Sequence, residues 1–294
     1  MGYGEGDYRY EEVEDWAKLP EGWKFSLVSD TAIDSKGRIY AFTRGTHPII
    51  VFDKAGNFIT SWGYGQFGQS PNLVSQSHGI FIGPDDEVYL TDSWQHIVRR
   101  YTRLGEMERE WGRRGISGVT FARVEYNMPT GVAIGPDGSI YVSDGYGGRC
   151  IHKYSKQGER LKSWGEGGSG PGQFAVVHNL GCTKDGRVLV CDRENDRIQV
   201  FDPDGVFIEE WKDLDMPGDV YIVDDMVYMI EQGGHGRVSV WTQEGERLSW
   251  FKGSKGGVLQ KPHGVCVDDE GSIYVAEISD DTGCGQRLQK FARV

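Results

Sequence analysis

The sequence is poor in cysteine, in positive charge and in long apolar runs, and each shortage excludes a class of protein. Its five cysteines are scattered and show no CxxC spacing, which leaves no cysteine-based metal motif and favours buried thiols. Acidic residues number 44 against 32 basic ones, and the formal charge of −12 argues against nucleic-acid or anionic-membrane partners. No apolar run approaches the roughly 20 residues that span a bilayer. Because the first residues are acidic and polar, no signal peptide is expected and the predicted location is cytoplasmic.

What the chain does contain is a repeat rich in glycine and aromatic residues. The 43 glycines, 9 tryptophans and 14 tyrosines suit a β protein with many tight turns. Residues 174–211 read as four short strands joined by KDG, RENDR and PDG, and this pattern recurs in five other units. One strand position is held by Tyr40, Tyr89, Tyr141, Leu189, Tyr228 and Tyr274. The fourth strand of the first five units ends in Trp62, Trp111, Trp164, Trp211 and Trp250.

A period of roughly 40–50 residues with four strands per unit predicts an all-β, six-bladed β-propeller of the NHL type. We expect one domain over residues 1–294, with blades at about 26–63, 78–112, 130–165, 178–211, 217–251 and 263–294. The sixth unit stops after its third strand. A strand near residues 10–18 is therefore expected to complete the last blade and close the ring.

Histidines alternate at one position of the first strand. Counting back 11 residues from the shared strand position gives Ser29, His78, Thr130, His178, Pro217 and His263. Alternate blades of six are related by about 120° around the axis, so three imidazoles should converge there. This is the ligand set of a catalytic zinc site, with His78, His178 and His263 as the predicted ligands. The remaining histidines share no register and are expected in loops or on the surface: His47, His96, His152 and His235.

The loops between the second and third strands should open on the same face as these histidines. They carry Arg44, Tyr146 and Arg193. An arginine at a channel mouth suits a substrate carboxylate, and a tyrosine beside a metal can serve as a base or a ligand. A carboxylate also recurs three residues after the shared strand position, and we expect it to cap loops. Its five instances are Asp92, Asp144, Asp192, Glu231 and Glu277.

The strings FTRGTH, SDGYGGRCI, GEGGSGPGQFAVVHNL, CDRENDRIQVF and KPHGV resemble peptidyl-α-hydroxyglycine α-amidating lyase, the second enzyme of C-terminal peptide amidation. In that family three axial histidines bind zinc, and two arginines and a tyrosine act at the site. The resemblance assigns these roles to His78, His178 and His263 and to Arg44, Tyr146 and Arg193. It implies a reaction that splits a carbinolamide into an amide and glyoxylate.

The chain also departs from the family pattern. Gly264 stands where the family has a carboxylate tied to calcium, which weakens the expectation of structural calcium. Gly147 stands where the family has a disulfide cysteine, in keeping with a reducing compartment. The sequence contains no copper monooxygenase domain, so we expect a small-molecule substrate, with a carboxylate. Two alternatives stay open: a metal-dependent lactone or ester hydrolase, and a non-catalytic propeller that binds protein partners.

Overall fold

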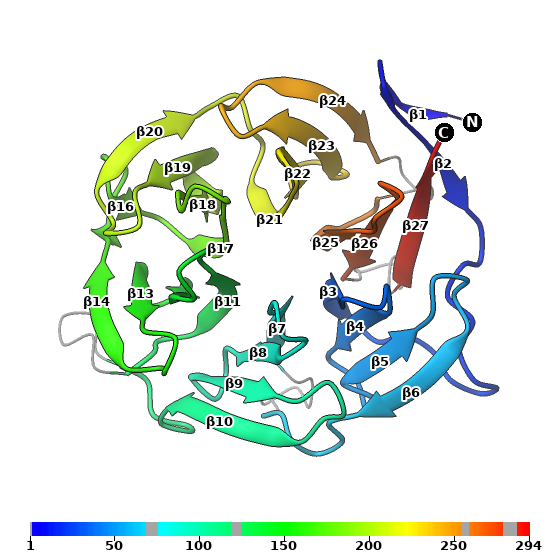
Figure 1. Cartoon of the computed structure of the whole chain (residues 1–294), viewed down its shortest axis with the longest axis horizontal. Coiled ribbons are helices and arrows are strands. Elements are labelled where there is room, and N and C mark those ends of the chain that lie inside the picture. The colour runs from blue at the N-terminus through cyan, green and yellow to red at the C-terminus, as the bar shows by residue number, and fades with distance from the viewer. Residues whose placement is uncertain (1, 69–75, 119–124, 254–258, 279–286) are drawn as a thin grey trace.

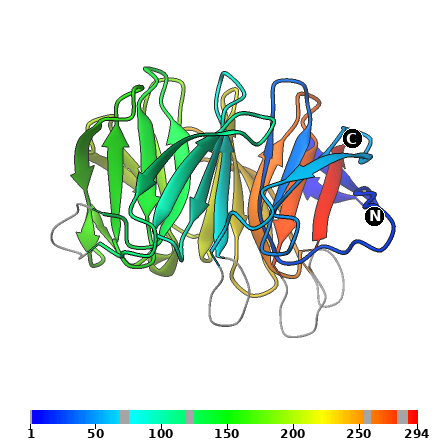
Figure 2. The same ribbon diagram turned by 90° about the horizontal axis from the view of Figure 1, so that it is seen from below.

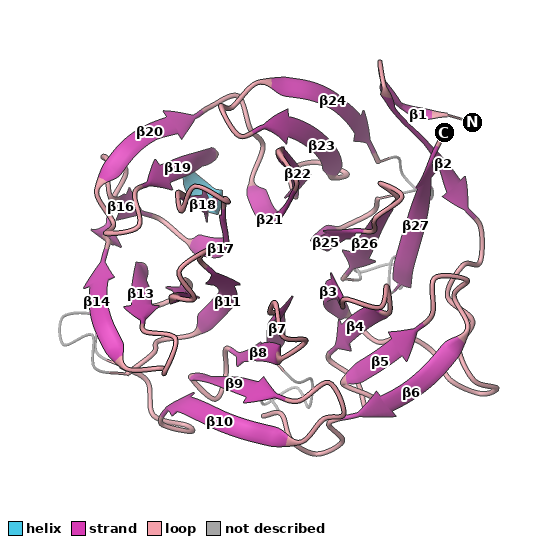
Figure 3. Cartoon of the chain, in the orientation of Figure 1, coloured by secondary structure: helices cyan, strands magenta, loops and turns pink. Residues whose placement is uncertain are grey.

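The computed structural model describes residues 2–68, 76–118, 125–253, 259–278 and 287–294, and these form a ring of six antiparallel sheets (Figures 1 and 3). Blade one contains β3 (Val28–Ile33), β4 (Ile39–Thr43), β5 (Ile49–Phe52) and β6 (Phe58–Trp62). Blade two contains β7 (Ser77–Ile82), β8 (Val88–Asp92), β9 (Ile97–Tyr101) and β10 (Met107–Gly112). Blade three contains β11 (Pro129–Ile134), β12 (Ile140–Asp144), β13 (Cys150–Tyr154) and β14 (Arg160–Trp164).

Blades four and five repeat this order. Blade four contains β17 (Val177–Cys182), β18 (Val188–Asp192), β19 (Arg197–Phe201) and β20 (Phe207–Trp211), with a short helix, η1 (Arg193–Asn195), after β18. Blade five contains β21 (Pro217–Val223), β22 (Met226–Glu231), β23 (Arg237–Thr242) and β24 (Arg247–Lys252). Two short strands, β15 (Glu166–Gly167) and β16 (Gln173–Phe174), pair in parallel between blades three and four. The six-bladed propeller predicted from the repeat is confirmed.

Blade six combines both ends of the chain. Its strands are β25 (Pro262–Val267), β26 (Ile273–Glu277), β27 (Arg287–Arg293), β2 (Tyr8–Val13) and β1 (Tyr3–Glu5). Since β2 pairs with β27, an N-terminal strand closes the ring as predicted, and the two termini lie side by side (Figure 1). The strand overlaps the expected range near 10–18 but ends earlier, at Val13. Asp15 adopts a φ of 49°, which ends the extended conformation and turns the chain towards blade one.

Four of the five repeated tryptophans join their blade to the next. The indole of Trp62 lies against Gly105 in the last turn of blade two, where a Cβ would overlap it. Three further pairs follow the same rule: Trp111 with Gly158, Trp164 with Gly205, and Trp211 with Gly245. Trp16 lies against Gly56 of blade one, and its Nε1 donates a hydrogen bond to the Lys54 carbonyl at 3.0 Å. Trp16 therefore joins blade six to blade one in the way that the repeated tryptophans join blades one to four to the blades that follow them.

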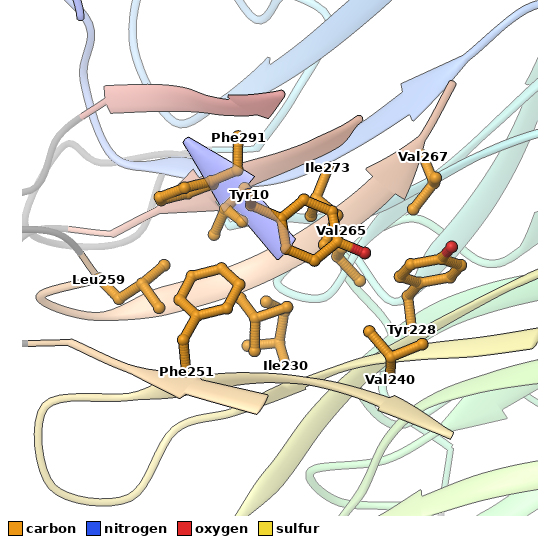
Figure 4. Close-up of a cluster of buried hydrophobic side chains, with 12 residues drawn as sticks. Tyr10, Tyr228, Ile230, Val240, Phe251, Leu259, Val265, Val267, Ile273 and Phe291 are labelled. Carbon is orange, nitrogen blue, oxygen red and sulfur yellow. The ribbon is translucent and has the colours of Figure 1, made fainter. Parts of the chain in front are cut away.

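The closing strand also contributes to the core between blades five and six (Figure 4). Tyr10 is fully buried there, with its ring centroid 6.0 Å from that of Phe251, which in turn lies 5.0 Å from Phe291. Burying an aromatic side chain contributes about 1.5–3 kcal/mol. The strand that closes the ring thus contributes a side chain to the hydrophobic core.

The first strand of every blade lines the axis, and the last lies at the rim (Figure 1). Seen from the side, the strands run between two faces that carry the loops (Figure 2). The residue after the second strand donates its N–H to the residue just before the first strand, as Arg44 does to Leu27 at 2.9 Å and Arg193 to Val176 at 3.0 Å. This places the loops after the second strands beside the starts of the first strands, as the sequence predicted. Within the described residues, no helix is long and apolar enough to cross a membrane.

Candidate metal centre

The second residue of each inner strand faces its neighbours around the axis. In blade five this residue is Gly218, and the prediction of Pro217 was wrong by one position. The first hairpin of that blade is one residue shorter than in the others. Val227 pairs with Ile222 five residues earlier, whereas in blade one Ile39 pairs with Ile33 six residues earlier. The axial position is therefore held by Ser29, His78, Thr130, His178, Gly218 and His263.

The three histidines form a nearly symmetric triangle, which we call the axial ring. Their ring centroids are 4.8 Å apart between His78 and His178, 4.8 Å between His178 and His263, and 4.9 Å between His78 and His263. The three interplanar angles lie close together, at 64°, 66° and 67°. All three side chains are buried, with at most 4% exposed. The predicted convergence of three imidazoles on the axis is confirmed.

Each imidazole is anchored by the blade that follows it. Nδ1 of His78 lies 2.8 Å from the Thr130 carbonyl, Nδ1 of His178 lies 2.6 Å from that of Gly218, and Nδ1 of His263 lies 2.5 Å from that of Ser29. A carbonyl oxygen only accepts, so Nδ1 must carry the proton and donate it. Nε2 then presents its lone pair to the neighbouring rings, which is the state needed for metal ligation.

Burial keeps these imidazoles neutral. It lowers the pKa of His78 to about 3, with further lowering by the positive charges of Arg44 and Arg193. The pKa values of His178 and His263 are lowered well below the ordinary range, again chiefly by burial. The ligand nitrogens of the three residues lie within 4.8 Å of one another. Three neutral, oriented and converging imidazoles fit a divalent ion such as Zn²⁺.

Tyr146 lies directly on the axial ring. Its hydroxyl is 2.9 Å from Nε2 of His78 and 3.2 Å from Nε2 of His178. Burial raises the pKa of Tyr146, and the positive charges of Arg193 and Arg44 act in the opposite direction. The sequence placed this tyrosine on a loop facing the histidines, and the structure brings it into hydrogen-bond contact with two of them.

The two predicted arginines flank Tyr146 with different attachments. The guanidinium of Arg193 lies over the Tyr146 ring, 5.6 Å from its centroid, and donates to Glu194 at 2.9 Å and to the Gln232 side chain at 3.1 Å. Arg44 donates from Nε to the Ser77 carbonyl at 3.1 Å. Burial lowers the pKa of Arg44. Both arginines therefore add positive charge beside the tyrosine and the axial ring.

Sequence reasoning missed Gln232. This residue follows the second strand of blade five, as Arg44 follows that of blade one and Arg193 that of blade four. Its N–H donates to Met216 in the same way as the Arg193 N–H donates to Val176. The repeat register could have identified Gln232, because this residue occupies the same position in its blade as the two predicted arginines occupy in theirs.

The recurring carboxylates cap loops, as expected. Asp92 accepts the Gly68 N–H at 2.7 Å, Asp192 that of Ala175 at 2.9 Å, and Glu231 that of Asp215 at 2.9 Å. The expected loop or surface location of His152, however, was wrong. His152 lies in β13 with 1% of its surface exposed, because neighbouring blades cover both faces of this third strand.

Below the axial ring, the next residue of the inner strands forms a polar layer. Asp219 accepts the side-chain N–H of Asn179 at 2.5 Å and the Val265 N–H at 2.8 Å, and Asp30 accepts the Ile80 N–H at 2.8 Å. Burial raises the pKa of both carboxylates, and that of Asp30 is raised further by Asp219. A Cβ on Gly264 would overlap the Asp30 carboxylate. Asp30 thus fills the space that a side chain at position 264 would need.

The chain is similar to several known proteins. The NHL repeat matches residues 126–154 and 259–291. Peptidyl-alpha-hydroxyglycine alpha-amidating lyase 1 of Drosophila melanogaster is 28% identical over 259 residues, which cover 77% of this chain and 46% of that protein. The structure of a streptogramin B lyase matches with a TM-score of 0.63 at 14% identity, covering 96% of this chain and 86% of that one. This last similarity reflects a shared fold.

Human NHL repeat-containing protein 3 is 31% identical over 301 residues, which cover 94% of this chain and 82% of the human protein. The mouse protein of the same name is 30% identical over 288 residues, covering 88% and 78%. The similarity thus extends over all six blades and most of both relatives. This chain belongs to the family of NHL repeat-containing protein 3.

Proposed function

We propose that this chain is a metal-dependent carbon–nitrogen lyase. It would split a carbinolamide of the α-hydroxyglycine type into an amide and glyoxylate, acting on a small molecule that carries a carboxylate. Similarity to the Drosophila amidating lyase over 77% of the chain supports this class of reaction.

The observation that carries the proposal is the position of Tyr146. Its hydroxyl contacts Nε2 of both His78 and His178, so it shares the nitrogens that would ligate a metal. A proton-transfer group in this place is within reach of a substrate hydroxyl bound at the axial ring. When bound, a divalent ion would supply a Lewis acid that polarises a substrate oxygen.

Tyr146 would carry the proton that the reaction moves. It would take the proton of the carbinol hydroxyl while the C–O bond becomes a C=O bond. The C–N bond breaks, its electron pair goes to the amide nitrogen, and Tyr146 returns the proton there. Arg193, stacked on the phenol ring, would hold Tyr146 in place and favour its deprotonated form through its charge.

Arg44 is the better candidate for gripping the substrate carboxylate. The side chain of Arg193 already binds Glu194 and Gln232, whereas Arg44 uses its Nε for the Ser77 carbonyl. No described residue accepts a hydrogen bond from the two terminal nitrogens of Arg44. A carboxylate pairs with such a fork through two parallel hydrogen bonds.

The test is glyoxylate release from an N-acyl-α-hydroxyglycine by protein loaded with zinc. We expect amide and glyoxylate in equal amounts, and loss of both products after chelation. Metal-loaded protein that releases no glyoxylate from any carbinolamide but opens a lactone or cleaves an ester would be a hydrolase instead. Protein that binds no divalent ion and shows neither activity would be a binding propeller.

A further inference from the structure

Blade three departs from the three blades that follow it at the point where the second strand ends. In the next three blades the carboxylate at this point pairs with an arginine of the third strand: Asp192 with Arg197, Glu231 with Arg237, and Glu277 with Arg287. These residues face each other in the strand ladders. In blade three the ladder partner of Asp144 is Cys150. A thiol therefore stands where three other blades have a guanidinium.

A histidine completes the group. Nε2 of His152 lies 3.6 Å from Sγ of Cys150 and 3.5 Å from a carboxylate oxygen of Asp144. The three side chains are 1–2% exposed, and their ligand atoms lie within 4.8 Å of one another. The separation of 3.5 Å between nitrogen and oxygen exceeds the 2.7–3.2 Å, roughly, of an N–H···O hydrogen bond.

These separations match two edges of a tetrahedral metal site. With Zn–S bonds of about 2.3 Å and Zn–N and Zn–O bonds of about 2.0–2.2 Å, tetrahedral angles give S···N and N···O separations of about 3.6 and 3.4 Å. The charges of the proposed ligands also favour a metal ion at this place. A thiolate and a carboxylate carry two negative charges, which a divalent ion would neutralise inside the fold, as arginine balances the carboxylate in blades four to six.

Neighbouring groups hold the imidazole of His152 in place. Nδ1 of His152 lies 2.7 Å from Oγ of Ser163 and 3.0 Å from a terminal nitrogen of Arg160, which is also 3.0 Å from the same Oγ. Because a guanidinium only donates, Nδ1 accepts from Arg160 in this arrangement and Nε2 carries the proton. A metal on Nε2 would take the place of that proton. Nδ1–H would then donate to Ser163, and Arg160 would turn away from Nδ1 while keeping its bond to that hydroxyl. Such a hydrogen bond on the far nitrogen fixes the tautomer of a ligating histidine.

We propose that Asp144, Cys150 and His152, the blade-three cluster, form a second metal site that takes Zn²⁺ or a divalent ion of similar ligand preference. Binding would release the thiol proton, because the thiolate is the ligating form. The site would be structural. Asp144 and Cys150 stand at the two ends of the loop 145–149, so a shared metal would clamp the base of the loop that carries Tyr146.

Cobalt tests this site separately from the axial ring, because the axial ring contains no thiolate. The full chain is unfolded with chelator, so that buried sites are emptied, and refolded with Co²⁺. We expect about two cobalt ions per chain and a near-ultraviolet absorption band from thiolate-to-cobalt charge transfer. Cys150→Ser should lose that band and one ion, whereas His178→Ala should lose one ion and keep the band.

Cys191→Ser is the matched control, since Cys191 is equally buried but lies in blade four. It should keep both the band and both ions. Should Cys150→Ser fail to fold, His152→Asn serves instead and should lower the cobalt affinity measured at the band by about 10-fold or more. Refolded wild-type protein without a thiolate band would overturn the proposal, and so would a band that survives Cys150→Ser.

Discussion

The axial ring and the blade-three cluster both bring three buried potential metal ligands close together, but they are built in different ways. The axial ring takes one residue from each of three blades, and every Nδ1 is anchored by the carbonyl of the following blade. The blade-three cluster lies on two neighbouring strands of one blade. The axial ring can form only when all six blades close into a ring. The blade-three cluster needs only one hairpin and its surroundings.

The difference shows two ways in which a repeat acquires chemistry. Symmetry brings equivalent residues to one point, where their nitrogens could hold a metal ion, with Tyr146 and the arginines at its edge. Local variation places Cys150 where blades four to six have an arginine, in a compact group enclosed by protein. We therefore assign catalysis to the first region and a structural role to the second.

The largest expected effect is the loss of an axial ligand. His178→Ala leaves two imidazoles, which seldom hold zinc tightly, so glyoxylate release should fall about 10⁴-fold or more. Cys150→Ser should lower it by less than about tenfold, because the cluster supports the Tyr146 loop without touching substrate. The two variants are compared in the same assay at saturating zinc. Equal losses would mean that the division of roles between the two regions is wrong.

Tyr146→Phe should have the next largest effect. It removes only the hydroxyl that contacts His78 and His178, so fold and metal content should survive. If the phenol transfers the carbinol proton, kcat should fall about 10²–10⁴-fold. Steady-state glyoxylate release gives kcat, and metal analysis of the same sample gives occupancy. A variant with full activity and full metal content would remove Tyr146 from the mechanism.

The repeat explains why so much of the axial region could be predicted and so little of the blade-three cluster. Six copies of one pattern fix which residue of each inner strand faces the axis. The histidine triangle can therefore be predicted by counting residues back from the shared strand position in each repeat. Counting failed at Gly218, because a hairpin shorter by one residue shifts the register. Cys150 and His152 were not recognised as a pair, because their importance lies in differing from the other blades.

Arg44→Ala should separate binding from chemistry. If this guanidinium grips the substrate carboxylate, kcat/KM for a carboxylate substrate should fall about 10–100-fold, the worth of about 1.5–3 kcal/mol for a charged hydrogen bond. The neutral ester of the same substrate should lose much less. Comparing the two substrates on wild type and variant isolates the carboxylate contact. A variant that loses the same factor on both substrates would argue that Arg44 acts elsewhere.

The smallest expected effect concerns the axial ring without its metal. The folded pKa of His78 is about 3, below the ordinary value of 6.5, so below pH 6.5 the unfolded chain binds a proton that the folded chain does not. Stability should therefore fall as pH drops from 6.5 towards 3, by about 1 kcal/mol per pH unit for each such histidine. The raised pKa values of Asp30 and Asp219 act in the opposite direction, since there the folded chain binds the extra protons.

Removing one imidazole isolates the histidine contribution from that of the carboxylates. Chelator-treated His78→Gln should lose about 1 kcal/mol less stability than wild type between pH 6 and pH 5, as measured by denaturant unfolding. His235→Gln is the matched control, because His235 is exposed and lies outside the axial ring, so it should follow the wild type. If His78→Gln also followed the wild type, the imidazole of His78 would gain its proton as readily in the fold as in the unfolded chain. The axial ring would then lack the neutral, desolvated character that distinguishes it as the candidate metal centre.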